Sequence, residues 1–247
     1  MIFGRPIYRY TAVASTQDIA RDLSRAGEPP GTVVTAESQT QGRGRRGRQW
    51  HAAPGANVML TAICPPVPLG VAWQIALLAG VAVAEAVQAV VPAADARVRF
   101  PNDVLVQGRK LAGILVETAF GGDPERVVPL LGIGLNVKAG PLPPEIARRA
   151  VSLEETTDKG ISVPDVEAAV LQRLGSNWEL WTSEGMDAIL AAWRSLSDPE
   201  ARRTFVLDGE STLCRVVEIA ADGATTLETE DRRTYQLAAG HVILGDD

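Results

Sequence analysis

Cysteine and histidine are scarce in this sequence, and both shortages exclude classes of chemistry. The only cysteines among the 247 residues are Cys64 and Cys214, which are too few for a disulfide framework or a zinc knuckle. Histidine occurs twice, and the motifs GxSxG, HExxH and GxxxxGK(S/T) are absent. We therefore expect no histidine-dependent nucleophile, and the cysteine usage favours a cytoplasmic protein.

Long uninterrupted apolar runs are also missing. The first 15 residues lack the continuous apolar stretch of a secretory signal. The most apolar segment, residues 71–91, is rich in alanine and is interrupted by Gln74, Glu85 and Gln88. These polar residues favour a buried core helix over a membrane span, so no membrane partner is expected.

Basic residues are outnumbered by acidic residues, 24 to 30, which gives a formal net charge of −6. This balance argues against the broadly basic surface of a non-specific nucleic-acid binder, so any anion site must be local. Hydrophobic residues make up 46% and charged residues 22% of the chain, which is typical of a globular protein. The length suits one large domain with a small appendage.

The pattern of short β-type runs and helical segments predicts an α+β fold. The expected strands are residues 32–37, 57–63, 98–100, 104–106, 111–118 and 127–137, and the expected helices lie within residues 71–91 and 163–196. From Thr204 onward, short β-type runs are separated by Asp208-Gly209 and Asp222-Gly223, both typical hairpin turns. We place a boundary near Asp198-Pro199, with a catalytic domain over residues 1–200 and a small β-barrel over residues 201–247.

An arginine- and glycine-rich loop is the most unusual feature. Residues 42–48 read GRGRRGR, in which Gly42 frees the backbone and Arg43, Arg45 and Arg48 supply forked, permanently charged donors. Such a loop suits a phosphate or a carboxylate. A flexible solvated loop and a nucleic-acid-binding arm remain open as alternatives.

Three further clusters carry polar residues in apolar surroundings. Lys110 stands out because this chain has only three lysines among its 24 basic residues, and a compact ammonium can act as a point charge against a phosphate or carboxylate. The others are Asn102-Asp103 and the sequence GIGLN at residues 132–136, which could also be turn or bulge residues. A cationic, glycine-rich site of this kind suits chemistry on phosphates.

Taken together, these motifs resemble the signature set of biotin protein ligases, over nearly the whole chain from Ser15-Thr16 onward. They are QTQGRGRRGRQW at residues 39–50, PND at 101–103, GRKLAGILVE at 108–117 and GIGLN at 132–136. The resemblance implies a mixed-sheet catalytic domain akin to class II aminoacyl-tRNA synthetases, followed by an SH3-like barrel. It also implies activation of biotin with ATP to biotinyl-5'-AMP and transfer to a lysine of a biotin carboxyl carrier protein domain.

The resemblance assigns roles to individual positions. The biotin head group would be held by Ser15, Thr16, Gln39 and the backbone of Gly113, with apolar neighbours and glycines, Gly42, Gly132 and Gly134 among them, enclosing the rest. Gln17 is a further candidate binding residue. Arg43 and Arg45 would neutralise the biotin carboxylate and the α-phosphate, and Arg48 the other ATP phosphates.

The nucleotide end is assigned in the same way. Trp50 would cover the adenine, and Lys110 would sit where the carboxylate attacks the α-phosphate. Asn102 and Asn136 would help to seat the nucleotide and Mg²⁺, whose direct ligands stay unassigned. Asp103 would orient or deprotonate the acceptor lysine, so the expected catalytic residues are Lys110, Arg43, Asp103 and Arg48.

The sequence departs from the family pattern at three positions. Gln17 stands where the family usually has Asn, Arg99 where it has Lys, and Phe100 where it has Trp. Arg99 keeps the charge with another shape and Phe100 keeps an aromatic wall without the indole donor, so we expect altered nucleotide affinity with activity retained.

The residues alone leave two other functions and the oligomeric state open. A lipoate or octanoate protein ligase would share the fold, and a non-catalytic binder would use the arginine loop on RNA or DNA. Because little chain precedes Ser15, we expect no helix-turn-helix and no specific DNA binding. The protein is expected to be a monomer or a homodimer.

Overall fold

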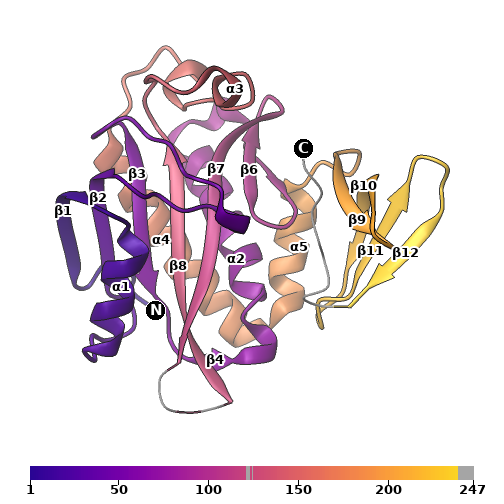
Figure 1. Cartoon of the computed structure of the whole chain (residues 1–247), viewed down its shortest axis with the longest axis horizontal. Coiled ribbons are helices and arrows are strands. Elements are labelled where there is room, and N and C mark those ends of the chain that lie inside the picture. The colour runs from indigo at the N-terminus through magenta and orange to yellow at the C-terminus, as the bar shows by residue number, and fades with distance from the viewer. Residues whose placement is uncertain (121–122, 124, 239–247) are drawn as a thin grey trace.

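The computed structural model describes residues 1–120, 123 and 125–238 (Figure 1). In this part of the chain a mixed sheet has the strand order β1-β2-β3-β8-β7-β6-β5, and β4 pairs with β8. The β1–β2 pair is parallel and the other pairs are antiparallel. The strands are β1 Ile7–Val13, β2 Val33–Gln39, β3 Asn57–Ile63, β4 Val67–Pro68, β5 Arg97–Arg99, β6 Asp103–Val106, β7 Arg109–Phe120 and β8 Arg126–Asn136.

Helices cover the two faces of this sheet unequally. The helices α2 Gln74–Val90, α4 Val163–Glu184 and α5 Met186–Leu196 lie behind the sheet in Figure 1, whereas α1 Thr16–Arg25 lies in front of it. Successive residues of a strand point to opposite faces, so Val33 belongs to the large core under α2 and α4, and Val34 to the small core under α1. The rest of the front face is left for the arginine loop.

Helix α2 confirms the buried core helix expected over residues 71–91. Its residues from Ile75 to Val87 are buried except Ala76 and Glu85. The segment Leu69–Val90 is long and apolar enough to cross a membrane by length and composition alone, but 67% of its most apolar window is buried inside the protein. A core helix passes the same test.

Tight turns place the chemistry-bearing residues. The predicted β6–β7 hairpin is confirmed, with Gln107 at φ 53° and Gly108 at φ 73° between the strands. Positive φ at both central residues matches the right-handed twist of a hairpin. This turn brings Lys110, at the start of β7, next to Asp103, at the start of β6.

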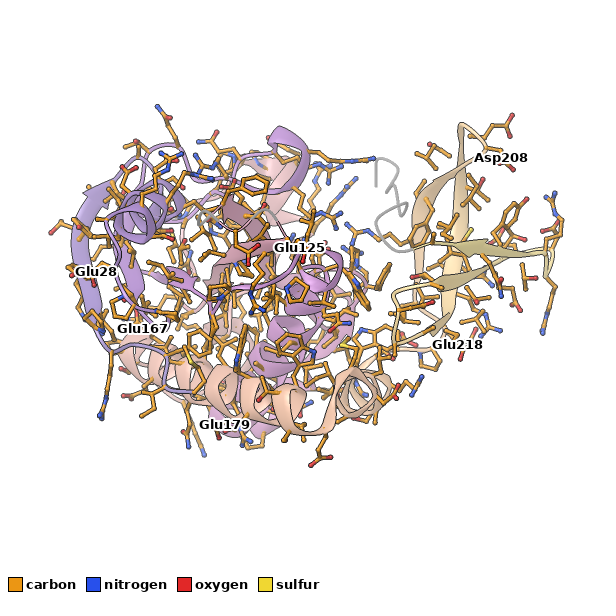
Figure 2. All side chains as sticks on the ribbon, turned by 90° about the horizontal axis from the view of Figure 1, so that it is seen from below. Glu28, Glu125, Glu167, Glu179, Asp208 and Glu218 are labelled. Carbon is orange, nitrogen blue, oxygen red and sulfur yellow. The ribbon has the colours of Figure 1, made fainter. Side chains whose placement is uncertain are left out.

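The C-terminal residues form a second, separate sheet at one end of the molecule (Figures 1 and 2). Four antiparallel strands have the order β12-β11-β10-β9, with both predicted Asp-Gly turns in place. This sheet is consistent with the expected SH3-like domain, of which residues 239–247 lie outside the described part. The strands are β9 Arg202–Leu207, β10 Glu210–Ile219, β11 Thr225–Thr229 and β12 Thr234–Leu237.

The two sheets share a continuous hydrophobic core. Phe205 and Leu227 of the C-terminal sheet belong to the same buried cluster as Phe100 and the residues of α2. Gln74 ties the parts together, because its Nε2 donates to the carbonyl of Ala221 and its Oε1 accepts from Trp181 Nε1. The division into a catalytic domain over residues 1–200 and a small barrel over residues 201–247 stays a prediction.

Some elements had no counterpart in the sequence-based expectation. These are β1, α1, the two-residue β4 and the short α3 Pro144–Ala147. The expected helical stretch over residues 163–196 is two helices, because Gly185 adopts φ 82° between α4 and α5.

Candidate active site

The arginine loop crosses the front of the sheet as a closed, hydrogen-bonded hairpin. Trp50 N donates to the carbonyl of Gly42, and Gly44 N donates to that of Arg48. A 3-10 turn, Arg45–Gly47, forms its tip, with Arg46 at φ 58°. Gly42 itself lies at the base of the loop, where an added Cβ would come 2.7 Å from the carbonyl oxygen of Trp50.

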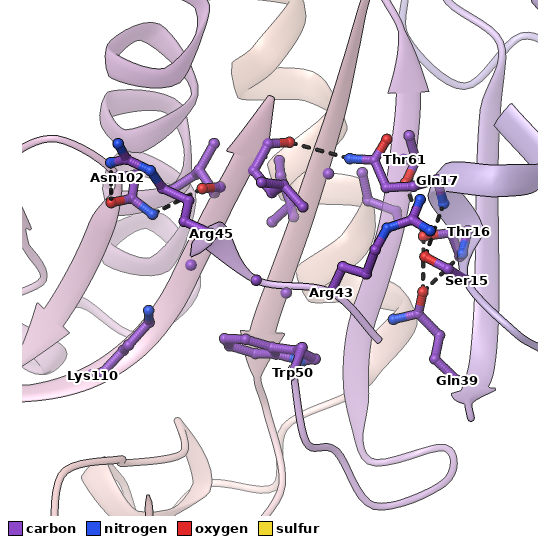
Figure 3. A pocket seen from close by; sticks show the side chains of 18 residues that line it. Ser15, Thr16, Gln17, Gln39, Arg43, Arg45, Trp50, Thr61, Asn102 and Lys110 are labelled. Atoms are coloured by element: carbon purple, nitrogen blue, oxygen red, sulfur yellow. Dashed lines mark hydrogen bonds between the residues drawn. The ribbon is translucent and has the colours of Figure 1, made fainter. Parts of the chain in front are cut away.

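Two neighbouring cavities form the candidate site, and the first lies beneath this loop (Figure 3). Its volume is about 60 Å³, below the roughly 300–1,000 Å³ of typical ligand pockets. Predicted residues from six segments of the chain meet in its wall: Ser15, Thr16, Gln17, Gln39, Arg43, Arg45, Trp50, Asn102, Lys110, Gly113, Gly132 and Gly134.

One end of this cavity is a cluster of small polar side chains. Gln39 Oε1 accepts from the backbone N of Thr16 at 2.8 Å and from its Oγ1 at 3.1 Å. Thr16 Oγ1 also lies 2.8 Å from Thr61 Oγ1. Ser15 caps α1, where its Oγ accepts from Gln17 N. Hydroxyl and amide groups held in this way can read a planar ring with both donors and acceptors.

Gln17 closes the cavity beside Gly132. Its Nε2 donates to the carbonyls of Leu115 and Leu130, at 3.2 and 3.3 Å, while its buried Oε1 has no partner. An added Cβ at Gly132 would lie 2.6 Å from Gln17 Nε2. The larger Gln in place of the family's Asn is therefore accommodated by this glycine.

Trp50 forms part of the wall between the first cavity and the second. Its ring packs on β8, where a Cβ at Gly134 would come 2.4 Å from the indole, and on β7, where one at Gly113 would come 3.2 Å from it. Lys110 Nζ lies 5.8 Å from the centroid of this ring. A Cβ at Gly134 would overlap the indole unless the ring moved, and one at Gly113 would make a tight contact with it, because the ring lies directly against the strands.

Arg43 is anchored by two carboxylates at the cavity mouth. Its Nη1 lies 2.8 Å from Asp18 Oδ1 on α1, and its Nε lies 3.3 Å from Glu117 Oε1 on β7. Glu117 also pairs with Arg21. The loop is therefore fastened to the sheet on this side.

The second cavity, of about 590 Å³, is large and cationic. Trp50, Arg45, Asn102 and Lys110 belong to the walls of both cavities. The other residues around it include Arg46, Arg48, Asp103, Asn136, Arg149 and Arg203. The arrangement suits a polyanion whose reactive end meets the first cavity.

Asp103 lies at the centre of a cluster of cations and is only 1% exposed. Its carboxylate pairs with Lys110 Nζ at 2.6 Å, Arg99 Nη2 at 2.9 Å and Arg203 Nη1 at 3.1 Å. Burial by itself raises the pKa of this carboxyl, but Lys110, Arg203 and Arg99 outweigh it and lower the pKa to about 2. A carboxylate with so low a pKa is a weak base, which favours the expected role of Asp103 in orienting the acceptor amine over its expected role in deprotonating it. Both roles stay predictions.

Asn102 links the same turn to the arginine loop. Arg45 Nη1 donates to Asn102 Oδ1 at 3.1 Å, and Asn102 Nδ2 donates to the carbonyl of Ile114 at 3.0 Å. Burial and the neighbouring charge of Arg203 lower the pKa of Arg45. Asn136 is held at the far side by a hydrogen bond from its Nδ2 to the carbonyl of Val151.

Sequence reasoning missed Thr61 and Arg203, and the carboxylates Asp18 and Glu117. Thr61 is a hydroxyl in the otherwise largely apolar strand β3, which is a signal that could have been used. Arg203 stands in an Arg-Arg pair at the start of the C-terminal sheet, and nothing local distinguishes it from its neighbour.

The sequence relationships support one family. The model of the biotin/lipoate A/B protein ligase family matches residues 10–136. The chain belongs to this family. It is 32% identical over 237 residues to the bifunctional ligase/repressor BirA of Bacillus subtilis, with 93% of this chain and 71% of the relative covered. It is also 32% identical over 240 residues to a biotin–[acetyl-CoA-carboxylase] ligase of Mycobacterium tuberculosis, covering 93% and 85%.

Solved structures in the family share the fold. The biotin protein ligase of Aquifex aeolicus in complex with biotin and ATP has a TM-score of 0.78 at 24% identity, with 98% of this chain and all of that one covered. The Leishmania major enzyme in complex with biotinyl-5-AMP has a TM-score of 0.65 at 24% identity, covering 94% and 98%. The match to the Aquifex aeolicus enzyme extends across both sheets.

Proposed function

We propose that the protein is a biotin protein ligase, which uses ATP to convert biotin to biotinyl-5'-AMP and pyrophosphate and then passes the biotinyl group to a carrier-protein lysine. The observation that carries this proposal is the junction of the two cavities. The first cavity, a polar recess, meets the second, cationic cavity at Lys110, Arg45 and Trp50. An acid bound in the recess would present its carboxylate to a nucleotide in the cationic cavity.

The polar recess favours biotin over lipoate or octanoate. The hydroxyls of Ser15 and Thr16, the amide of Gln39 and the unpartnered Gln17 Oε1 offer donors and acceptors at its closed end. A ureido ring can donate to the unpartnered Gln17 Oε1 and use the remaining bonding capacity of the others, whereas a dithiolane ring or an alkyl chain would leave this buried acceptor unpaired.

Lys110 is the residue best placed to promote the first step. A biotin carboxylate oxygen attacks the α-phosphorus, the bond to the β-phosphate oxygen breaks, and pyrophosphate leaves. Two anions must approach each other, so a fixed ammonium beside the reacting atoms lowers the barrier. Asp103 holds this ammonium at 2.6 Å and thus fixes its position.

Mg²⁺ would accompany the nucleotide. The described residues contain no group of three or more His, Cys, Asp or Glu side chains that could hold a metal ion. A Mg²⁺ ion here would therefore take most of its ligands from the triphosphate and from water, as is usual for ATP sites. The amide oxygens of Asn102 and Asn136 are the candidate protein contacts, and the ion would neutralise charge on the phosphates.

The arginine loop would open and close during turnover. The first cavity is too small for a ligand of biotin's size while Arg43 and Trp50 stand in its wall. Binding therefore requires these side chains to move, and their return over the adenylate would keep water from the mixed anhydride. Arg43, Arg45 and Arg48 would then contact the carboxylate and phosphate groups.

The second step needs a lysine from another protein. Its neutral amine would attack the biotinyl carbonyl, form the amide and release AMP. We propose a biotin carboxyl carrier domain as the acceptor and the cytoplasm as the place of reaction, where the free cysteines Cys64 and Cys214 stay reduced.

Biotin-dependent exchange of labelled pyrophosphate into ATP tests the first step. We expect exchange with biotin and none with lipoate or octanoate. Lys110→Ala should reduce the rate by roughly 10²- to 10³-fold, as for the loss of one donor to a charged transition state. Lys159→Ala is the matched control, because this lysine is exposed and lies outside both cavities.

The alternative acids make the result decisive. Exchange with lipoate or octanoate in place of biotin would contradict the substrate, and no exchange with any of these acids in a folded protein would contradict the adenylating activity.

A further inference from the structure

Arg203 brings the C-terminal sheet into direct contact with the active site. Strand β9 alternates between half-buried and buried residues, and Arg203 shares the buried side with Phe205 and Leu207. An arginine in that row is unexpected, because the other two positions fill the hydrophobic core. Arg203 is 8% exposed and also lines the cationic cavity.

The guanidinium of Arg203 contacts the turn between β5 and β6 at two points. Its Nη1 donates to the carbonyl of Phe100 at 3.2 Å and lies 3.1 Å from Asp103 Oδ2. A buried cation needs such partners, since removal from water is costly unless charge and hydrogen bonds compensate. Asp103 in turn needs its cations for the same reason.

This turn positions two residues of the nucleotide site. Asp103 Oδ1 holds Lys110 Nζ at 2.6 Å, and Asn102 Oδ1 accepts from Arg45 Nη1 at 3.1 Å. Arg203 fixes the opposite carboxylate oxygen, Oδ2, together with Arg99. The carboxylate is thereby held from both sides.

We propose that Arg203 is a positioning residue for formation of the acyl-adenylate, acting through Asp103 on Lys110. The C-terminal sheet then contributes to activation of the acid as well as to the stability of the fold. This inference rests on the proposed adenylating function. Without Arg203, the Asp103 carboxylate can rotate toward Arg99, and Lys110 moves with it.

A double-mutant cycle with Lys110 tests this pathway, with biotin-dependent pyrophosphate exchange as the readout. Arg203→Met keeps the apolar stem of the side chain and removes the charge. We expect its exchange rate to fall by about 10- to 100-fold, as misplacement of a reacting group by about 1 Å can cause. In a Lys110→Ala background the same change should cost less than about threefold, because residues that act as a unit are not additive.

Two variants separate positioning from folding. Arg203→Lys retains a charge but cannot contact Phe100 and Asp103 as a fork does, so its loss should be smaller than that of Arg203→Met and should likewise vanish in the Lys110→Ala background. Arg215→Met is the matched control, because Arg215 lies in the same sheet and pairs with Glu228 and Glu200 away from the site. It should leave exchange unchanged.

Each outcome supports or contradicts the inference. If Arg203→Met lowers the exchange rate by the same factor in the wild type and in the Lys110→Ala background, Arg203 acts independently of Lys110 and the inference is wrong. Unchanged exchange in Arg203→Met would also overturn it. If Arg203→Met does not fold, the same cycle with Arg203→Lys decides. Absence of exchange in the wild type would contradict the proposed function instead.

Discussion

The ionisation of Asp103 follows from its neighbours. Desolvation alone would raise the pKa of a carboxyl that is 1% exposed, yet Lys110, Arg203 and Arg99 lower its pKa from the ordinary 3.8 to about 2. A carboxyl whose pKa is lower in the folded state stabilises the fold above its ordinary pKa. That stabilisation is lost as the pH falls from about 4 to about 2.

Asp103→Asn should therefore be less stable than the wild type at pH 6, and this difference in the free energy of unfolding should shrink as the pH falls. At pH 6 the ionised carboxylate contributes about 2 kcal/mol from its shifted pKa, and the amide, which cannot titrate, lacks this contribution. Denaturant unfolding of both proteins between pH 6 and pH 2.5 measures the gap. A gap that stays constant over this range would show that Asp103 does not titrate as inferred.

Individual site residues differed in how far the sequence could predict them. For Gly132 and Gly134 the sequence left open a role in the site or in a bulge, and the structure shows why glycine stands there, since Gln17 and Trp50 lie against them. Arg203 was not recognisable, because its importance depends on where a separate sheet docks. Contacts between distant segments leave no local pattern.

At the scale of elements, two ion pairs fasten the arginine loop. Arg43 bonds to Asp18 of α1 and to Glu117 of β7, and all three side chains are partly exposed. Such pairs contribute about 0.2–1 kcal/mol each. These two pairs therefore supply only a small part of the energy that holds the loop closed, beside the hydrogen bond from Arg45 to Asn102 and the packing of Trp50.

The double variant Asp18→Asn/Glu117→Gln should open this loop more often. Loss of roughly 1 kcal/mol corresponds to about a fivefold larger open population, which limited trypsin digestion at the loop arginines would report as faster cleavage. Asp22→Asn removes an exposed pair with Arg25 on the same helix and should cleave like the wild type. Unchanged cleavage of the double variant would mean that the remaining contacts, among them Arg45 with Asn102 and Trp50 with the strands, hold the loop without these pairs.

Elements with a strong apolar period or a clear turn were predictable, and others were not. The strand β3 and the hairpin at Gln107-Gly108 lie where the sequence placed them. Helix α1 was missed because its buried residues, Thr16, Gln17 and Ala20, are mostly polar. Thr16 and Gln17 face the first cavity, so the apolar stripe on the core side is limited to Ile19, Ala20 and Leu23.

At the scale of the whole molecule, the large mixed sheet has most of the hydrophobic core on one face and the candidate active site on the other. The back face carries most of the hydrophobic core, under α2, α4 and α5. The front face carries α1 and the arginine loop, with the cavities between them and the strands. The C-terminal sheet joins the core at one end and supplies Arg203 to the front, so stability and activity are coupled there.

This continuity predicts that the two sheets unfold together. Phe205 of β9 is fully buried in the shared core, and Phe205→Ala should reduce the free energy of unfolding by about 3–5 kcal/mol, as for other large-to-small core changes. Leu213→Ala, at a position 43% exposed in the same sheet, is the control and should change it by about 0.5 kcal/mol or less. Calorimetry should give a single transition that moves to lower temperature in Phe205→Ala. A separate early transition, with biotin-dependent exchange retained after it, would show that the C-terminal sheet folds independently and that the active site does not depend on it.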